Sequence, residues 1–198
     1  EKLYATYKTN KFSSDQRKKF IFEIEKLSAI LQRQVLGKAY KRLKKERKTK
    51  ADQTNRYFEI LADVDKSRFD EFTYLKAETA YAMRDYNEAF ISYRDTFEWS
   101  VKYRKTKFKK KSMDNMLVTL SHFKNRPQAN IYVFEKFIEH YPNDKRMKTI
   151  YERLFNNYME IKDYPKAKLT IERYAKRFPK STSQEVMIAK LMDVRRKQ

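Results

Sequence analysis

The stretch of residues 151–179 constrains the fold of this chain more than any other. Starting from Tyr151, bulky and small residues follow at spacings of 3, 4, 7, 13, 16, 20, 23 and 28, at Leu154, Phe155, Tyr158, Tyr164, Ala167, Ile171, Tyr174 and Pro179. The first of these repeat at i, i+3, i+4 and i+7, which is the spacing of one apolar helix face. Pro165 interrupts that face, because a proline disfavours helical geometry in its predecessor and fits the first turn of a new helix. The pattern predicts two helices joined by a tight turn.

This spacing resembles the tetratricopeptide repeat (TPR), a motif of roughly 34 residues that folds into two antiparallel helices. An upstream copy has Ala77 and Ala89 at the two small positions and Asp85-Tyr86 where the last copy has Asp163-Tyr164. A middle copy has Pro127 in its turn, with its small residue displaced to Ala129 and Asn130 on the motif position. The copies repeat at about 37 to 41 residues, longer than the usual motif. The resemblance covers roughly residues 70 to 198.

The endings of two copies, Tyr141-Pro142 and Phe178-Pro179, resemble those of TPR repeats in bacterial cell-envelope lipoproteins. The outer-membrane assembly factor and the Tol-Pal coordinator are of this type. The resemblance implies a protein-protein interaction scaffold in the periplasm or cell envelope, with a cytoplasmic scaffold as the alternative.

The resemblance also implies an all-α fold, a right-handed superhelix of antiparallel helix pairs (a TPR-like α-solenoid) with long N-terminal helices. Composition agrees, since one glycine and four prolines leave little turn chemistry for a β protein. We expect a helical segment at 1–69, with a truncated repeat and a long basic helix. Three repeats follow within 70–180, at about 70–101, 110–143 and 148–181. Residues 181–198 form a capping helix or begin a further repeat whose apolar face could drive self-association.

The N-terminal segment carries its own helix signals. Ser13 or Ser14 can cap a helix, and an apolar stripe follows at Phe20, Ile24, Leu27, Leu31 and Val35. The stripe continues into the basic segment as one long helix, or Gly37 breaks it. Residues 101–112 are the expected connection between repeats. The chain starts at Glu1 without Met, from which we expect a fragment or a mature form.

Two short runs hold most of the charge, which is formally +21. Each run contributes +7, from residues 38–50 and 102–111. The candidate basic patch is Lys38, Lys41, Arg42, Lys44, Lys45, Arg47, Lys48, Lys102, Arg104, Lys105, Lys107, Lys109, Lys110 and Lys111. Tyr40, Tyr103 and Phe108 interleave with these cations, a composition that neutralises phosphates and stacks bases. A solvated helix surface explains the same charge.

Enzymatic chemistry finds little support in the sequence. One glycine cannot build a phosphate-binding loop, and no cysteine is present to act as a nucleophile or metal ligand. His122 and His140 fall on different predicted helices and lack the i, i+4 spacing of a helical metal pair. We therefore expect no catalytic site, no cofactor and no metal. No apolar run approaches the ~18 residues of a transmembrane helix.

The resemblance places a partner-binding groove along the first helix of each repeat. The groove positions are Tyr74, Glu78, Tyr81, Ser121, Lys124, Asn125, Arg153, Asn156 and Glu160. Of these, Tyr74 and Tyr81 are the best anchors, because tyrosine buries a large area at low entropic cost. Arg153 and Asn156 suit a carboxylate clamp, but the rest of such a clamp is missing, and we do not assign it.

Two kinds of partner are consistent with these features. We expect a peptide or helix of another protein in the groove, and the basic surface favours an acidic one. The alternative is RNA, DNA or another anionic polymer bound through the basic runs. Salt distinguishes them, because phosphate contacts weaken steeply with added salt and apolar contacts do not.

Overall fold

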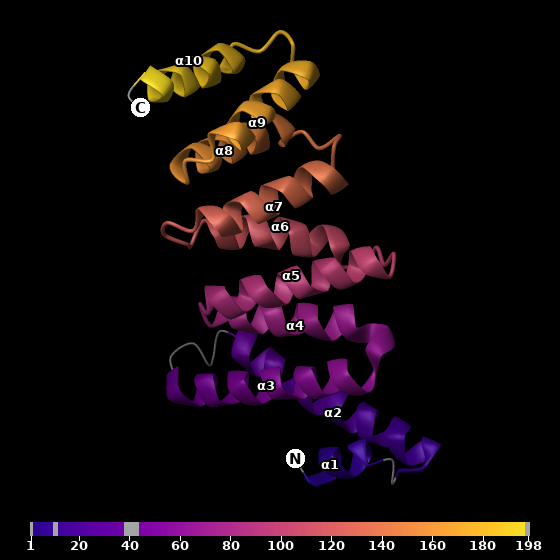
Figure 1. The fold of residues 1–198 in the computed structure, drawn as a ribbon. Helices are drawn as coiled ribbons and strands as arrows, with labels where there is room; N and C mark the ends of the chain where they lie inside the picture. The colour runs from indigo at the N-terminus through magenta and orange to yellow at the C-terminus, as the bar shows by residue number, and fades with distance from the viewer. Residues whose placement is uncertain (1, 10–11, 38–43, 197–198) are drawn as a thin grey trace. The chain divides into compact units, whose positions relative to one another are not determined.

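A computed structural model describes residues 2–9, 12–37 and 44–196 of the chain, which form helices joined by turns with no strand (Figure 1). The prediction of an all-α fold is therefore confirmed over these residues. The helices are α1 (Lys2–Lys8), α2 (Ser14–Leu36), α3 (Lys44–Val64), the 3₁₀ turn η2 (Lys66–Arg68), α4 (Phe69–Ala82), α5 (Tyr86–Lys102), α6 (Lys109–Leu120), α7 (Pro127–His140), α8 (Met147–Glu160), α9 (Tyr164–Arg177) and α10 (Ser183–Arg196). Within the described ranges, no helix is both long and apolar enough to cross a membrane.

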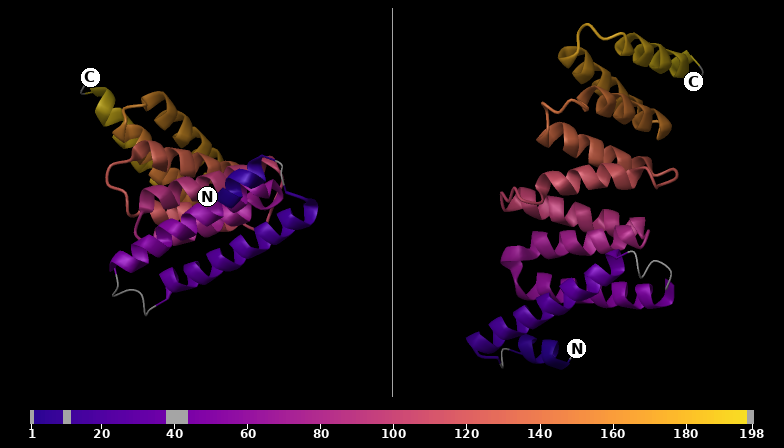
Figure 2. Two further views of the ribbon diagram at one scale, coloured as in Figure 1. Left: turned by 90° about the horizontal axis from the view of Figure 1, so that it is seen from below. Right: turned by 180° about the vertical axis from the view of Figure 1, so that it is seen from behind.

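Helix contacts divide the chain into two compact units, residues 1–122 and residues 123–198. In the first unit, α2 to α6 lie side by side in chain order, and α2 also contacts α4 (Figures 1 and 2). In the second unit, α7 to α10 pack in chain order, and α8 also contacts α10. The two helices of the predicted middle repeat, α6 and α7, belong to different units.

The core of the second unit is built from the spaced residues that begin at Tyr151. Leu154 and Phe155 are fully buried, and Tyr151 and Tyr158 are no more than 6% exposed. On α9, Ala167 and Tyr174 are also fully buried. The predicted apolar faces of these two helices are therefore confirmed as the faces that pack together.

The first unit buries two kinds of residue where α4 meets its neighbours. Ala77 and Ala89 are fully buried, as the two small positions predict, and let α4 and α5 approach closely. On the other side of α4, Phe72 packs into a cluster with Phe58 and Leu61 of α3. Each fully buried side chain of this size stabilises the fold by about 1.5–3 kcal/mol relative to an exposed one.

Both ends of α2 follow from short-range signals in the sequence. Ser13 caps the helix, since its hydroxyl accepts from the Gln16 amide at 3.3 Å while the Gln16 side chain accepts from the Ser13 amide at 2.8 Å. This reciprocal capping box satisfies two amides that have no partner within the helix. At the other end, Gly37 leaves helical geometry with φ −67° and ψ 145°. Gly37 therefore ends α2 at Leu36, and the helix does not continue into the basic run.

Two turns share one design at positions 78 residues apart. Arg84 and Lys162 adopt left-handed backbone conformations, with φ values of 64° and 61°, where a glycine is usual. The next residue in each case is an aspartate whose carboxylate accepts from an amide of the following helix, at 3.1 Å for Asp85 and 3.2 Å for Asp163. The amides of Asp85 and Asp163 bond back to the preceding helix, at 3.0 and 2.9 Å. The two turns thus end one helix and start the next by the same interactions.

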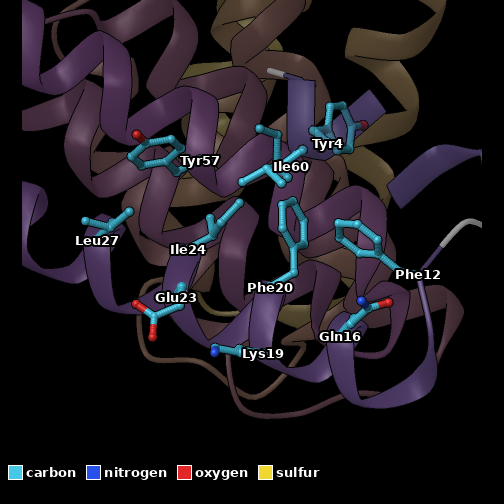
Figure 3. Close-up of a pocket in the computed structure, with 11 residues that line it drawn as sticks. Tyr4, Phe12, Gln16, Lys19, Phe20, Glu23, Ile24, Leu27, Tyr57 and Ile60 are labelled. Atoms are coloured by element: carbon cyan, nitrogen blue, oxygen red, sulfur yellow. The ribbon is translucent and has the colours of Figure 1, made fainter. Parts of the chain in front are cut away.

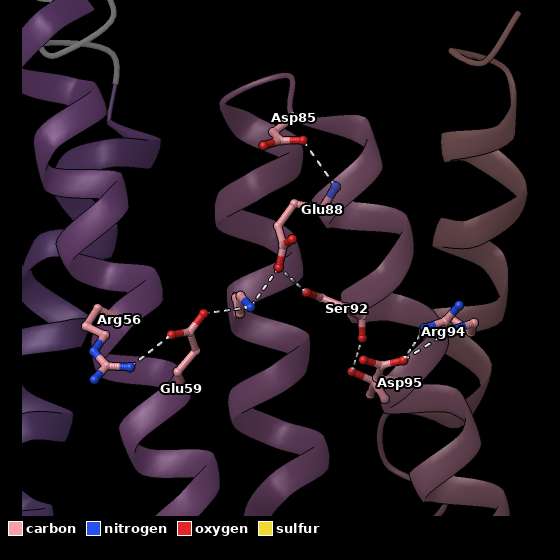
Figure 4. A network of polar contacts seen from close by, with 9 residues as sticks. Arg56, Glu59, Asp85, Glu88, Ser92, Arg94 and Asp95 are labelled. Atoms are coloured by element: carbon pink, nitrogen blue, oxygen red, sulfur yellow. Dashed lines mark hydrogen bonds and ion pairs between the residues drawn. The ribbon is translucent and has the colours of Figure 1, made fainter.

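A lysine ties the three central helices of the first unit together. Lys76 of α4 contacts Glu59 of α3 at 2.9 Å and Glu88 of α5 at 2.7 Å, and its side chain is only 19% exposed. Figure 4 shows the carboxylates of Glu59 and Glu88 pointing into the space between these helices. Burial opposes the charged form of this lysine, but the hydrogen bonds and charges of Glu88 and Glu59 outweigh burial and raise the pKa of Lys76. The carboxylates therefore keep a largely buried cation charged between the helices.

Replacing the helix cap Asp85 by alanine (Asp85→Ala) should lower the free energy of unfolding of the first unit by about 1 kcal/mol, within about 0.5–2. The reason is that the amide of Glu88 loses its acceptor. Urea unfolding followed by the fluorescence of Trp99, the only tryptophan, measures this. Asp52→Ala removes the same charge from an exposed position of α3 and should change the value by less than about 0.5 kcal/mol. Equal losses in both variants would contradict the capping role.

Candidate interaction surfaces

Three of the predicted groove residues lie on one face of α4 and meet α6. The Glu78 carboxylate oxygen Oε1 accepts from the Tyr93 hydroxyl at 2.5 Å and from the Asn115 amide at 2.8 Å. The same Asn115 amide nitrogen donates to the Tyr74 hydroxyl at 3.2 Å. A small cavity of about 130 Å³ opens beside them, lined by Glu78, Tyr81, Tyr93, Asn115 and Val118. The structure therefore brings Tyr74, Glu78 and Tyr81 together around an internal network.

The phenols of this network are held protonated. Burial, followed by the Glu78 charge, raises the pKa of Tyr74 to about 12. Burial and the hydrogen bond to Glu78 raise the pKa of Tyr93 further above its ordinary value. Both hydroxyls thus remain neutral donors or acceptors near neutral pH, and Glu78 is the only charged side chain lining this cavity. Glu78 makes the immediate surroundings acidic, although the chain as a whole is basic.

Tyr81 takes part in an aromatic cluster with Tyr86 and His122. The Tyr81 hydroxyl lies 3.2 Å from Nε2 of His122. The ring of Tyr86 stacks on that of His122 with centroids 3.8 Å apart and an interplanar angle of 2°. His122 follows the end of α6, so the prediction that it lies on a helix is wrong. No group of three or more His, Asp or Glu side chains that could hold a metal occurs within the described residues.

The groove positions predicted for the middle repeat are misplaced. Because α6 ends at Leu120, Ser121 is its C-terminal cap, and Lys124 and Asn125 lie in the turn before α7. Asn125 has a φ of 50°, a conformation that belongs to a turn rather than a helix. These three residues therefore do not line a helix face.

The three positions predicted for the last repeat lie on α8. Arg153, Asn156 and Glu160 are exposed and follow each other at i, i+3 and i+7 on one side of the helix. The Asn156 amide oxygen accepts from the Lys190 ammonium of α10 at 3.5 Å. This face thus reaches a neighbouring helix, and Arg153 and Glu160 remain exposed beside it.

An apolar pocket that was not expected from the sequence lies among α1, α2 and α3 of the first unit. Its volume is about 520 Å³. Figure 3 shows Phe20, Ile24 and Ile60 within it, with Gln16, Lys19 and Glu23 along one edge. The complete lining is Leu3, Tyr4, Phe12, Gln16, Lys19, Phe20, Glu23, Ile24, Leu27, Tyr57 and Ile60.

The pocket exists because the predicted apolar stripe of α2 is only partly covered. Phe20 and Val35 are buried, but Leu27 is 46% exposed, so neighbouring helices do not cover the stripe along its whole length. Phe22, on another side of the helix, is 61% exposed. Helix α2 therefore presents large apolar side chains to solvent as well as to α3.

The short helix α1 forms one wall of this pocket and is fixed by specific contacts. The Tyr4 hydroxyl donates to the Asp63 carboxylate at 2.5 Å, and Lys8 contacts the same carboxylate at 3.1 Å. Hydrogen bonds from Tyr4, Lys66 and Lys8 hold the pKa of Asp63 well below its usual range. The ring of Tyr7 stacks on Phe20 with centroids 5.2 Å apart. Together these contacts hold α1 against α2 and the end of α3.

The first basic run is divided between solvent and the interior. Lys38, Lys41 and Arg42, and Tyr40 among them, lie outside the described residues. Lys44, Lys45 and Lys48 are exposed on the first turns of α3. Arg47 instead donates to the Val35 carbonyl at 2.8 Å and to the Ala82 carbonyl at 3.0 Å. Its guanidinium thus bridges the ends of α2 and α4, unlike the three exposed lysines around it.

The second basic run spans the end of α5, a turn and the start of α6. Lys107 contacts Glu71 at 3.4 Å, and Lys110 contacts Asp114 at 3.1 Å within α6. Phe108 is 7% exposed and packs against Tyr74 with ring centroids 4.9 Å apart, so it is a core residue. The members that remain exposed are Lys102, Arg104, Lys105, Lys107, Lys110 and Lys111.

Comparison with protein-family models and with curated protein sequences gives no match to this chain.

Changing Glu78 to glutamine (Glu78→Gln) should lower the pH at which Tyr74 and Tyr93 ionise, because the negative charge that opposes ionisation is removed. The shift should be partial, since burial of the phenols is the larger cause and remains. Tyrosinate absorbance at 295 nm between pH 9 and 12.5 measures it. Because the folded pKa is raised, this contribution to stability is complete below about pH 10 and is lost as the pH rises through about 12.

The matched control for this titration is Glu98→Gln, which removes a carboxylate of α5 that does not line the cavity. The two titration curves of the control and the unaltered protein should superimpose. If the titration curve of Glu78→Gln also matched these two curves, Glu78 would not influence the pKa of Tyr74 or Tyr93.

Proposed function

We propose that this protein is a non-catalytic protein-interaction scaffold built from TPR-like helix pairs, which binds an acidic amphipathic segment of another protein in the α1–α3 pocket. The observation that carries the proposal is that pocket, an apolar cavity of about 520 Å³ on a chain with a formal charge of +21. Its size is within the usual range of ligand and peptide sites.

The repeat architecture is supported by contacts between helices two apart. Helix α2 contacts α4, and α8 contacts α10. Helix α4 meets α6 through the bonds of Asn115 to Glu78 and Tyr74. In a helix-pair solenoid the first helices of successive repeats stack in this way. The matching turns at Asp85 and Asp163 support the same assignment, from which we infer a right-handed superhelix.

Apolar burial is the source of affinity in the pocket. Phe20, Ile24 and Ile60 line it, and Leu27 lies at its edge with nearly half of its side chain in solvent. A leucine or phenylalanine of the partner that becomes fully buried there contributes about 1.5–3 kcal/mol. Two or three such anchors contribute about 3–9 kcal/mol before the cost of association, and the attraction between the basic surface and the acidic groups of the partner adds to this. The groove face of α4 is less suitable, because its polar groups already bond each other.

Charge favours an acidic partner. Lys19 lines the pocket, and Lys26 follows two turns later on the same exposed side of α2. The net positive charge also steers an acidic segment towards the surface and raises its association rate. Glu23 at the same edge disfavours acidic groups directly above it, so the acidic residues of the partner should lie towards Lys19 and Lys26.

The assignment as a non-enzyme rests on the sequence, which lacks a phosphate-binding loop and a thiol nucleophile. The location in a bacterial cell envelope rests on the resemblance of the repeat endings alone and stays a prediction.

The test uses a fluorescein-labelled helical peptide of about 15 residues with leucine at i, i+3, i+4 and i+7 and glutamate on its polar face. Fluorescence anisotropy should give a dissociation constant of about 1–100 µM. Leu27→Glu should weaken binding at least tenfold, because it places a charge at the apolar edge. The control Leu169→Glu changes a leucine of α9 that is 44% exposed, against 46% for Leu27, and should leave the affinity unchanged.

Two results would overturn this proposal. One is equal weakening by Leu27→Glu and Leu169→Glu, which would show that binding is not at the pocket. The other is stronger binding of a companion peptide whose glutamates are replaced by lysine, which would exclude an acidic partner. Circular dichroism confirms that both variants retain their helix content.

A further inference from the structure

Three aromatic rings form a stack at one end of α4 and α5, in the first unit. The Trp99 ring lies between Phe69 and Tyr103, with centroid distances of 4.4 Å and 4.1 Å. Tyr103, at one end of the stack, is 45% exposed, unlike the aromatic residues in the core of this unit. The stack therefore ends in a tyrosine ring that solvent can reach.

The backbone around Tyr103 holds this ring in place. The Tyr103 amide donates to the Trp99 carbonyl at 2.9 Å, and the Lys105 amide donates to the Ser100 carbonyl at 2.8 Å. Arg104, between them, adopts a left-handed conformation with φ 54°. The indole nitrogen of Trp99 is buried without a hydrogen-bond partner, so packing, including the ring contacts, positions the indole. The exposed ring is thus preorganised and loses little freedom when a flat ligand contacts it.

Cations surround the stack on both sides. Lys102 lies over the Tyr103 ring at 5.1 Å, and Lys66 lies over the Phe69 ring at 5.9 Å. Arg104 and Lys105 are exposed and, like Lys102, form no ion pair within the described part of the chain. A neighbouring cavity of about 350 Å³ is lined by Ser67, Arg68, Asp70, Glu71, Arg104, Lys105, Thr106, Lys107 and Phe108.

Two acidic side chains line this cavity, the buried Asp70 and Glu71, and Glu71 is already paired with cations. Glu71 contacts Arg68 at 3.0 Å and Lys107 at 3.4 Å, and these cations help hold the pKa of Glu71 below its ordinary value although burial opposes this. The exposed cations that follow one another around Tyr103 are Lys102, Arg104 and Lys105.

We propose that Tyr103 and the turn after it form a binding site for single-stranded nucleic acid. A base stacks on the exposed face of Tyr103, and the Lys102 ammonium, which lies over this ring in the unbound structure, moves aside to contact a phosphate together with Arg104 and Lys105. A flat ring beside a short run of cations matches the alternation of base and phosphate along a single strand. A duplex fits poorly, because its bases are stacked on each other and do not expose a face. This site is separate from the α1–α3 pocket and does not depend on the proposal made for that pocket.

The single tryptophan of the chain makes the site directly observable. Trp99 contacts the inner face of Tyr103, so a base stacked on the outer face should quench or shift its emission. The ligand is an oligothymidylate of 12 nucleotides. Trp99 is excited at 295 nm, a wavelength at which the oligonucleotide absorbs little. With three phosphates neutralised, affinity should fall roughly 20-fold between 50 and 200 mM salt.

Variants are compared by the anisotropy of the same oligonucleotide carrying a terminal fluorescein, because changing Tyr103 also alters the surroundings of Trp99. Tyr103→Ala should weaken binding about tenfold or more, and Tyr103→Phe, which keeps the ring, should bind as the unaltered protein does. The triple change Lys102→Gln, Arg104→Gln and Lys105→Gln should abolish most of the affinity and its salt dependence. The matched control removes three exposed cations of the second unit, Lys148, Lys176 and Lys180, and should bind nearly normally.

The proposal fails if Tyr103→Ala binds as tightly as Tyr103→Phe, because stacking would then contribute nothing. It fails equally if a 12-base-pair duplex binds as tightly as the single strand, or if the two triple variants lose the same affinity. Either result would mean a general attraction of a basic protein for polyanions. Absence of any binding at 50 mM salt also overturns it.

Discussion

The reversal of the chain between paired helices is the constraint on which the rest of this structure depends. Only one glycine is present, and it ends α2 in an extended conformation. The left-handed positions that reverse the chain are therefore occupied by Arg84, Arg104, Asn125 and Lys162. Such a conformation costs a non-glycine residue roughly 1–2 kcal/mol. At Arg84 and Lys162 the following aspartate offsets that cost by capping the next helix, and the short turn brings the apolar faces of both helices into register. The buried contacts of Ala77 with α5 and of Tyr151 with α9 require these turns.

The positive charge of the chain serves two purposes, and the contacts separate them. Arg47 closes two helix ends, Lys76 joins three helices, and Arg68 pairs with Glu25 and Glu71. These cations are held by carboxylates or carbonyls of the first unit, and removing Glu59 or Glu88 would leave the largely buried charge of Lys76 less compensated. Within residues 2–9, 12–37 and 44–196, Lys102, Arg104 and Lys105 have no such partners, and they are exposed beside an aromatic ring. The net charge of the chain does not distinguish the paired cations from the exposed ones, but the contacts of each cation do.

The sequence predicted well what depends on local period and on turn chemistry. Ala77, Ala89 and the residues that follow Tyr151 were expected in helix contacts and are buried, because a helix face is set by spacing alone. The positions Ser121, Lys124 and Asn125 were misplaced, because the middle copy has its small residue displaced and α6 ends earlier than the repeat spacing implies. Leu27 lies on the predicted apolar stripe but is exposed, because the period of a sequence identifies an apolar face without saying whether a neighbour covers it. The stack of Phe69, Trp99 and Tyr103 combines residues 30 positions apart, and no local pattern signals that contact.

The two proposed surfaces differ in the forces that act at them, although both lie in the first unit. In the α1–α3 pocket the attraction comes from apolar area removed from water, which salt affects little. Beside Tyr103 it comes from phosphates that replace condensed counterions, which salt opposes strongly. Both ligands are anionic, so each lowers the positive potential that attracts the other. By linkage this opposition is reciprocal, and it fades as the Debye length shortens, from about 10 Å at 0.1 M to about 3 Å at 1 M. An acidic protein and a nucleic acid should therefore each weaken the binding of the other, most strongly at low salt, although they share no contact residue.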